Sequence, residues 1–204
     1  MTPSFQKVLS LAGGTVAAIV LVLFLGWWQV DGPGAPTKDV PTNKLPLPID
    51  QMNFTLTADD GRRIVPADWI GQPLLVFFGF TYCPDVCPTT LTEITDWLDG
   101  LGQESERINV AFITVDPERD TFQAMSAYVE NFHPAITGYT GSPSDIADVA
   151  RGLRAKYEKV VTGQTYTMDH TAGIFVYDAQ GMFVTVIDIH EPKTTAVQKI
   201  KRAL

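Results

Sequence analysis

The chain of 204 residues has little positive charge and little cysteine, and each shortage excludes a class of function. Only 15 basic side chains stand against 23 acidic ones, for a formal charge of −8. Because nucleic-acid binding needs a basic surface that replaces phosphate counterions, we expect no nucleic-acid partner. Two cysteines exclude a disulfide-rich scaffold and a zinc site of four cysteines. A hydrophobic share of 45% excludes a disordered tail protein.

One long segment near the amino terminus has no charge at all. Residues 8–30 as a helix would be about 35 Å long, enough to cross a hydrocarbon core of about 30 Å. No small-x-small site precedes Asp31, so an uncleaved transmembrane anchor is favoured over a signal peptide. Lys7 favours a cytoplasmic segment over residues 1–7. We therefore predict a single-pass protein of the bacterial inner membrane with its soluble part in the periplasm.

Two further segments follow the predicted anchor. Residues 31–49 contain five prolines and two glycines, a composition that opposes regular helix or sheet and predicts a linker. Residues 50–204 then form one soluble domain, which is long enough for a single hydrophobic core.

Strand and helix patterns alternate along this domain. Residues 73–80 are a continuous apolar run, which is typical of a strand buried on both faces, and we expect a second buried strand over 109–115. We expect further strands over 53–57, 173–177 and 182–188, and helices over 88–101, 120–132, 142–157 and after Pro192. This order predicts an α/β domain with a parallel sheet that has an antiparallel part, covered by helices on both faces.

The two cysteines fall where such a sheet places its ligands. Cys83 and Cys87 follow the strand at 74–80 and precede the helix at Pro88, so they lie at the carboxyl end of a strand. A helix amino terminus stabilises a thiolate, the form that attacks disulfides and binds soft metals. The spacer of three residues, one longer than redox enzymes of this type prefer, lets both sulfurs point at one guest atom. A structural disulfide is the alternative, since residues i and i+4 can reach bridging distance in a helical turn.

His170 is the candidate for a third ligand. We expect it in the loop that enters the strand at Ile174, which faces the cysteines in thioredoxin-like enzymes and usually carries a cis-proline. No proline lies between His170 and Tyr177. Two thiolates can hold Cu(I), and an imidazole would help the site to hold Cu(II) as well. The alternative is an ordinary polar loop residue, as we expect of His133 and His190.

Charged residues follow the neighbouring strand. We expect Asp116 and Arg119 to flank the cysteine loop, where their charge could tune the thiolates. A tight turn is the alternative for this segment, and Asp120 is interpreted as the cap of the following helix.

Three separated motifs resemble the Sco/SenC family of copper-binding proteins. They are FTYCPDVCP at 80–88, DPERDT at 116–121 and DHTA at 169–172, the last followed by an apolar strand and Asp178. The resemblance covers residues 54–203 and implies a thioredoxin-like fold. It also implies a metallochaperone rather than an enzyme, which helps to assemble the dinuclear copper centre of cytochrome c oxidase.

Carried onto this chain, the resemblance implies that Cys83, Cys87 and His170 bind copper as Cu(I) and Cu(II). The implied partners are the copper-receiving subunit of the oxidase and other periplasmic copper chaperones or thiol reductases. Zinc could take the same three ligands, and only the resemblance favours copper.

Two other functions stay open. A membrane-tethered thiol–disulfide reductase, acting on the cysteines of a copper-receiving partner, needs only Cys83 and Cys87. A non-catalytic module with a fixed disulfide needs the same two residues. His170 discriminates between copper binding and these two functions, because metal binding uses the imidazole while disulfide exchange and a structural disulfide do not.

Overall fold

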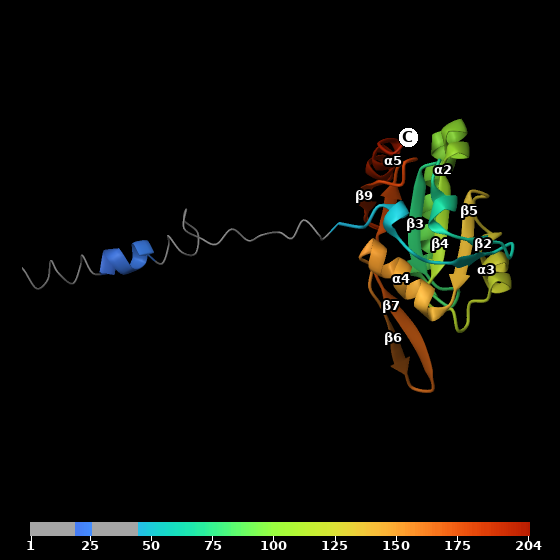
Figure 1. Ribbon diagram of the computed structural model, residues 1–204, viewed down its shortest axis with the longest axis horizontal. Helices are drawn as coiled ribbons and strands as arrows, with labels where there is room; N and C mark the ends of the chain where they lie inside the picture. Colours follow the sequence, from blue (N-terminus) through green and yellow to red (C-terminus); the bar gives the residue numbers. More distant parts are fainter. Residues whose placement is uncertain (1–18, 26–44) are drawn as a thin grey trace, which may run out of the picture. The chain divides into compact units, whose positions relative to one another are not determined.

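A seven-stranded sheet forms the centre of the computed structural model (Figure 1). Its strand order is β2-β1-β5-β4-β3-β8-β9, with β3, β4 and β5 parallel and the other neighbours antiparallel. The strands are β1 (Leu56–Ala58), β2 (Arg63–Ile64), β3 (Leu74–Gly79), β4 (Asn109–Thr114), β5 (Ile136–Gly141), β8 (Ile174–Tyr177) and β9 (Phe183–Ile187). The predicted parallel sheet with an antiparallel part is thus confirmed. Every residue of β3 is buried, as its continuous apolar run predicts.

Four α-helices pack around this sheet. They are α2 (Val86–Leu101), α3 (Phe122–Val129), α4 (Pro143–Leu153) and α5 (Lys193–Lys201), with short 3-10 turns at Ile49–Gln51, Pro66–Trp69 and Gly102–Arg107. Helix α2 packs beside α5, while α3 and α4 contact β5. Because α2 follows β3 directly, its first turn lies at the carboxyl end of that central strand, where α/β sheets hold their ligands.

The structure describes residues 19–25 and 45–204. Most of the predicted anchor at 8–30 and of the predicted linker at 31–49 lies outside these ranges. Residues 19–25 are helical with exposed apolar side chains. Within the two described ranges, no helix combines the length and the apolar character needed to span a membrane.

The folded domain begins earlier than residue 50. One compact unit spans Lys44–Leu204. The amide of Leu47 donates a hydrogen bond to the carbonyl of Gly152 at 2.8 Å, and Ile49 is fully buried in the core. The prolines around these residues do not prevent packing, because Pro48 directly precedes the 3-10 turn that begins at the buried Ile49.

Two segments differ from the sequence prediction. The sequence does not predict strand β5, because its two glycines weaken the strand pattern. The helix expected to reach residue 157 ends at Leu153, where Arg154 takes a left-handed conformation with φ of 59°. The chain then forms a hairpin of β6 (Tyr157–Thr162) and β7 (Thr165–His170).

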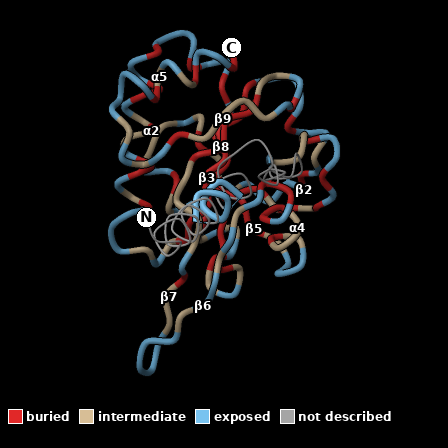
Figure 2. The backbone as a smooth tube through the Cα atoms, turned by 90° about the vertical axis from the view of Figure 1, so that its left-hand side faces the viewer, coloured by how far each residue is buried: buried red, intermediate tan, exposed pale blue. Residues whose placement is uncertain are grey.

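This β6–β7 hairpin projects from the body of the domain (Figures 1 and 2). Buried residues gather in the seven-stranded sheet, whereas the tip of the hairpin is exposed, and Val161 near the tip is 75% exposed (Figure 2). His170 is therefore the last residue of a strand and not part of an irregular loop, which corrects the sequence prediction.

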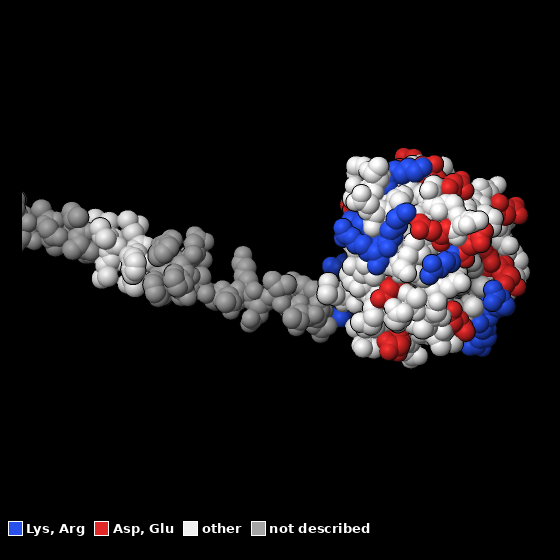
Figure 3. Space-filling view, turned by 90° about the horizontal axis from the view of Figure 1, so that it is seen from above, with Lys and Arg blue, Asp and Glu red and all other residues white. Residues whose placement is uncertain are grey.

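Figure 3 shows one face of the folded domain, on which both acidic and basic side chains occur. The absence of a nucleic-acid partner stays a prediction from the overall charge.

Candidate metal centre

The two cysteines lie on consecutive turns between β3 and α2. Cys83 is half-buried, and its amide donates a hydrogen bond to the carbonyl of Phe80 at 3.2 Å. Cys87 is fully buried in the first turn of α2, and its amide donates to Sγ of Cys83 at 3.3 Å. Both cysteines are free thiols. The local fold therefore brings the first sulfur to the helix amino terminus that carries the second.

Burial sets the protonation of Cys87. The loss of water around the side chain raises the pKa of the Cys87 thiol well above its ordinary value, and the side chain of Cys83 adds to this effect. The expected thiolate stabilisation at the helix amino terminus is thus outweighed at Cys87. A soft cation would reverse the balance, because metal binding displaces the proton from a thiol.

His170 faces this buried sulfur. Its Nε2 lies 3.8 Å from Sγ of Cys87, and its Nδ1 lies 3.0 Å from the carbonyl oxygen of Thr171. A carbonyl can only accept a hydrogen bond, so Nδ1 carries the proton and Nε2 presents its lone pair to the sulfur. Burial lowers the pKa of His170 below its ordinary value, which keeps the imidazole neutral and able to act as a ligand at neutral pH.

Two aromatic rings fix the plane of this imidazole. Phe77 and Phe80 approach it edge-on, with ring centroids 6.3 Å and 6.1 Å away. Both rings come from β3 and the residue that follows it, so the strand that leads into the cysteine loop also supports the histidine. The packed rings exclude water from one side of the candidate site.

The separation of the donors can be compared with a metal site. Two ligands at about 2.3 Å and 2.0 Å from one ion lie roughly 3.5 Å apart at a tetrahedral angle. The observed 3.8 Å between sulfur and nitrogen is close to this value. Within residues 19–25 and 45–204, however, no group of three or more His, Cys, Asp or Glu side chains is already arranged to hold a metal ion. Two donors therefore have a suitable spacing, and a three-ligand site would need adjustment of the side chains.

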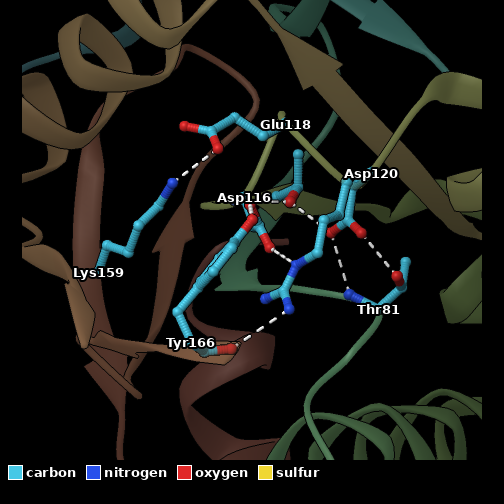
Figure 4. Close-up of polar contacts among 8 residues, drawn as sticks. Thr81, Asp116, Glu118, Asp120, Lys159 and Tyr166 are labelled. Carbon is cyan, nitrogen blue, oxygen red and sulfur yellow. Dashed lines mark hydrogen bonds and ion pairs between the residues drawn. The ribbon is translucent and has the colours of Figure 1, made fainter. Parts of the chain in front are cut away.

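Asp116 and Arg119 lie at the end of β4 and bond to the hairpin. The carboxylate of Asp116 is 1% exposed and forms an ion pair with Nε of Arg119. The hydroxyl of Tyr166 donates to the same carboxylate at 3.0 Å (Figure 4). Their hydrogen bonds connect the end of β4 to β7, and an effect of the two charges on the thiolates stays a prediction.

Asp120 has a different role from the predicted helix cap. Thr121 is the cap of α3, and its hydroxyl accepts from the amide of Ala124. The fully buried carboxylate of Asp120 instead accepts from the amide and hydroxyl of Thr81, at 3.0 Å and 2.6 Å (Figure 4). It also accepts from the hydroxyl of Thr114 at 2.6 Å. Asp120 thereby fixes the start of the cysteine loop, a role that sequence reasoning missed.

An open cavity of about 690 Å³ lies beside His170. It is lined by α4, by the residues after it and by the base of the hairpin, including Asp169, His170 and Thr171. The cysteines do not line this cavity, so the candidate metal centre lies at its edge. The cavity therefore gives the imidazole side of the site an opening to solvent.

Comparison with known proteins gives the family. Residues 46–204 match the SCO1/SenC family model. The chain belongs to the SCO1/SenC family. This match confirms the resemblance carried by the three sequence motifs.

Individual relatives of this SCO1/SenC chain agree with the match. The mitochondrial SCO2 homolog of Bos taurus is 40% identical over 139 residues, which cover 66% of this chain and 52% of the cattle protein. The chain thus spans about half the length of that relative. The structure of Bradyrhizobium japonicum ScoI with copper bound is 41% identical with a TM-score of 0.69, and the match covers 74% of this chain and 97% of that one. The structure of yeast Sco1 with copper bound is 29% identical with a TM-score of 0.68, over 78% and 87% of the two chains.

Proposed function

We propose that this chain is a copper metallochaperone that holds copper through Cys83, Cys87 and His170. We propose further that it helps to assemble the dinuclear copper centre of cytochrome c oxidase by giving copper to the receiving subunit. The observation that carries the proposal is the 3.8 Å approach of Nε2 of His170 to Sγ of Cys87, with Sγ of Cys83 bonded to the next turn. The copper-bound relatives and the naming of a Sco structure as that of a cytochrome c oxidase assembly protein support it.

The chemistry of the donors fits copper in both oxidation states. Two thiolates form a soft pair that suits Cu(I), and an imidazole nitrogen adds the harder donor that Cu(II) favours. The buried Cys87 must lose its proton on binding, while the neutral imidazole is ready without a change. Copper is the cargo in this proposal, so Cys83, the more exposed sulfur, is the ligand through which the ion enters and leaves.

Copper titration of the reduced full chain tests the ligand set. We expect one copper ion per chain, with loss of that stoichiometry in both Cys83→Ser and Cys87→Ser, because one thiolate with imidazole holds Cu(I) weakly. His170→Ala should still hold Cu(I) but lose the sulfur-to-copper charge-transfer colour of the Cu(II) form. His190→Ala is the matched control, because His190 is an exposed histidine in the turn that follows β9. Full stoichiometry in either serine variant would refute the site.

The free thiols also support a second candidate, a reductase that acts on the cysteines of a copper-receiving partner. Disulfide exchange needs an accessible sulfur and no imidazole, so His170→Ala should retain it. A strain with His170→Ala therefore separates the two functions. Metal delivery predicts defective oxidase assembly in low copper, whereas thiol reduction predicts normal assembly. Normal assembly together with unchanged Cu(II) spectra would favour the reductase.

We also propose that the domain is held in the periplasm by the segment at 8–30. The support is the uncharged length of that segment and the single Lys7 before it. Several curated relatives are named as mitochondrial proteins, which gives the alternative location. Proximity labelling by enzymes confined to either compartment decides between them.

A further inference from the structure

Arg119 contacts both halves of the candidate metal centre. Its guanidinium carbon lies 3.9 Å from the ring centroid of Tyr166 and 4.6 Å from that of Tyr82. Tyr82 is the residue directly before Cys83, and Tyr166 lies on β7, the strand that ends at His170. One cation therefore connects the loop that carries the sulfurs to the strand that carries the imidazole. A cation over the face of an aromatic ring is attracted to it, and more strongly where water is excluded.

Polar contacts hold the guanidinium in this place. Its Nε is paired with the buried carboxylate of Asp116, and its Nη1 donates to the carbonyl of Tyr166 at 3.3 Å. The Tyr166 hydroxyl donates to the other oxygen of Asp116, so the three residues form a closed ring of contacts (Figure 4). Nη2 of Arg119 is buried without a hydrogen-bond partner among the described residues. Its surroundings are aromatic, so ring contacts act on this side chain together with the polar contacts.

The geometry of a strand carries this restraint to the ligand. Residues two apart on a strand point to the same face, so Tyr166, Met168 and His170 share one face of β7. Met168 on that face is 7% exposed and packs into the core. Tyr166 is fixed by Arg119, and His170 faces Cys87. A shift at Tyr166 would therefore turn or lift the imidazole at the other end of this short strand.

The outer side of the hairpin has only a weaker connection. Nζ of Lys159 lies 4.3 Å from the Tyr166 ring and pairs with Glu118 at 2.6 Å (Figure 4). The side chains of Lys159 and Glu118 are 38% and 62% exposed, and solvent weakens an ion pair in such a place. Arg119, with its side chain 20% exposed, is the more buried of the two cations that touch Tyr166.

We propose that Arg119 is a positioning residue that holds the β6–β7 hairpin against the Tyr82 loop and so fixes His170 relative to both sulfurs. The ligand named here is copper, and in that respect the inference rests on the proposed function. Arg119 acts through geometry, because its planar guanidinium contacts two rings and a carboxylate at once. A lysine in its place keeps the charge but has neither the planar face nor the fork of donors.

Two substitutions of Arg119 in the full chain test this role. Groups that orient metal ligands typically change metal affinity by about 10–100-fold, so Arg119→Lys and Arg119→Gln should both weaken Cu(II) binding by at least tenfold. Both should also shift the sulfur-to-copper charge-transfer band, while Cu(I) affinity changes less than about threefold because the thiolates remain. If Arg119→Lys binds Cu(II) as tightly as the wild type while Arg119→Gln binds it more weakly, the effect comes from charge. That result would overturn the geometric role.

Two further variants show whether a change in copper binding comes from a loss of folding. Tyr82→Ser changes a residue that is 64% exposed, so the core stays intact, and it should shift the Cu(II) band in the same direction as the Arg119 variants. Arg62→Gln is the control, because Arg62 also pairs through Nε with an aspartate but lies on the exposed β1–β2 turn. Its Cu(II) spectrum and affinity should equal those of the wild type. If the Cu(II) spectrum of Tyr82→Ser is identical to that of the wild type, this would count against the role of the contact between Arg119 and the Tyr82 loop.

A measurement without metal separates this inference from the proposed function. In the apo protein, Arg119→Gln should speed amide hydrogen exchange in β7 at least about tenfold, with exchange in β3 and β4 unchanged. If the wild type fails to bind copper, the proposed function is wrong, and unchanged β7 exchange in Arg119→Gln would additionally overturn the positioning role. If the wild type binds copper while both Arg119 variants keep its spectrum and affinity, only the positioning role is wrong.

Discussion

Gly79 is the residue at which the cysteine loop has the least space. A Cβ built at this position would lie 2.5 Å from the Phe112 ring and 2.8 Å from Sγ of Cys87. Both distances are shorter than van der Waals contact, and Phe112 cannot move because it is fully buried in the core. The last residue of β3 therefore has to be glycine for Cys87 to occupy its present place.

We predict that Gly79→Ala destabilises the domain and displaces Cys87. Overpacking of this kind costs about 1–3 kcal/mol, which urea unfolding of the variant measures. Gly100→Ala is the matched control, because the added Cβ in α2 would meet only the flexible end of Lys193 at 3.4 Å. That control should be neutral or stabilising by up to about 1 kcal/mol, since alanine is the better helix former. Equal stability of Gly79→Ala and wild type would contradict the crowding argument.

Among individual residues, the sequence predicted the candidate ligands better than the residues that hold those ligands in place. Cys83, Cys87 and His170 carry distinctive chemistry, and the structure brings His170 to Cys87, although the ligand role stays a prediction. Asp120 was interpreted wrongly, because an aspartate before a helix has the same pattern whether it caps that helix or bonds to a distant loop. Only the fold shows that Thr81 and Thr114 end neighbouring parallel strands and meet one buried carboxylate.

Among the helices and strands, the β6–β7 hairpin is the largest feature that the sequence analysis does not predict. Its turn contains Gly163 with φ of 66°, a local signal for a tight hairpin that the sequence does hold. The helix was nevertheless extended to residue 157, because nothing in the local pattern requires Arg154 to take a left-handed conformation. The hairpin is fixed by distant contacts of Tyr166 with Asp116 and Arg119, and such contacts leave no periodic pattern.

The first turn of α4 provides a prediction about pH. Asp145 accepts hydrogen bonds from the Ser142 hydroxyl and from the amide of Thr55 at 3.0 Å, and these bonds hold the pKa of its carboxyl below the ordinary 3.8. A depressed pKa in the folded state means that the carboxylate stabilises the fold above pH 3.8, and that this contribution disappears as pH falls through the lower folded value. The ionised carboxylate thus ties α4 to the segment before β1.

Asp145→Asn should therefore lower the melting temperature at pH 7, and the difference from wild type should shrink as pH falls towards 3. Thermal unfolding of both proteins across this range measures the effect. Asp50→Asn, at an exposed carboxylate in the 3-10 turn at Ile49–Gln51, serves as the control and should change the melting temperature little. A difference that stays constant from pH 7 to pH 3 would mean that Asp145 acts without ionisation.

For the whole molecule, the order of strands and helices was enough to predict the α/β class and the site at a strand end. The central strand β3 is a continuous apolar run, and β4 is apolar between Asn109 and Thr114, so the burial of both strands needs no long-range information. Strand β5 and the early start of the domain at Lys44 depend instead on packing. Leu47 and Ile49 look like part of a proline-rich linker in sequence, yet both bond to or pack on residues more than a hundred positions away.

The uncharged segment at residues 8–30 is predicted to decide how the domain is held in the cell. We expect residues 8–30 to remain in the mature protein as a membrane anchor, because the uncharged run is about 35 Å long as a helix and has no cleavage motif before Asp31. Intact-mass measurement of the protein extracted from membranes should give a chain that retains these residues. Alkaline carbonate should leave the full chain in the membrane fraction, whereas a control chain that starts at Lys44 should be released. A mature chain beginning near Asp31 would instead identify the segment as a cleaved export signal, and the copper site would then act without a tether.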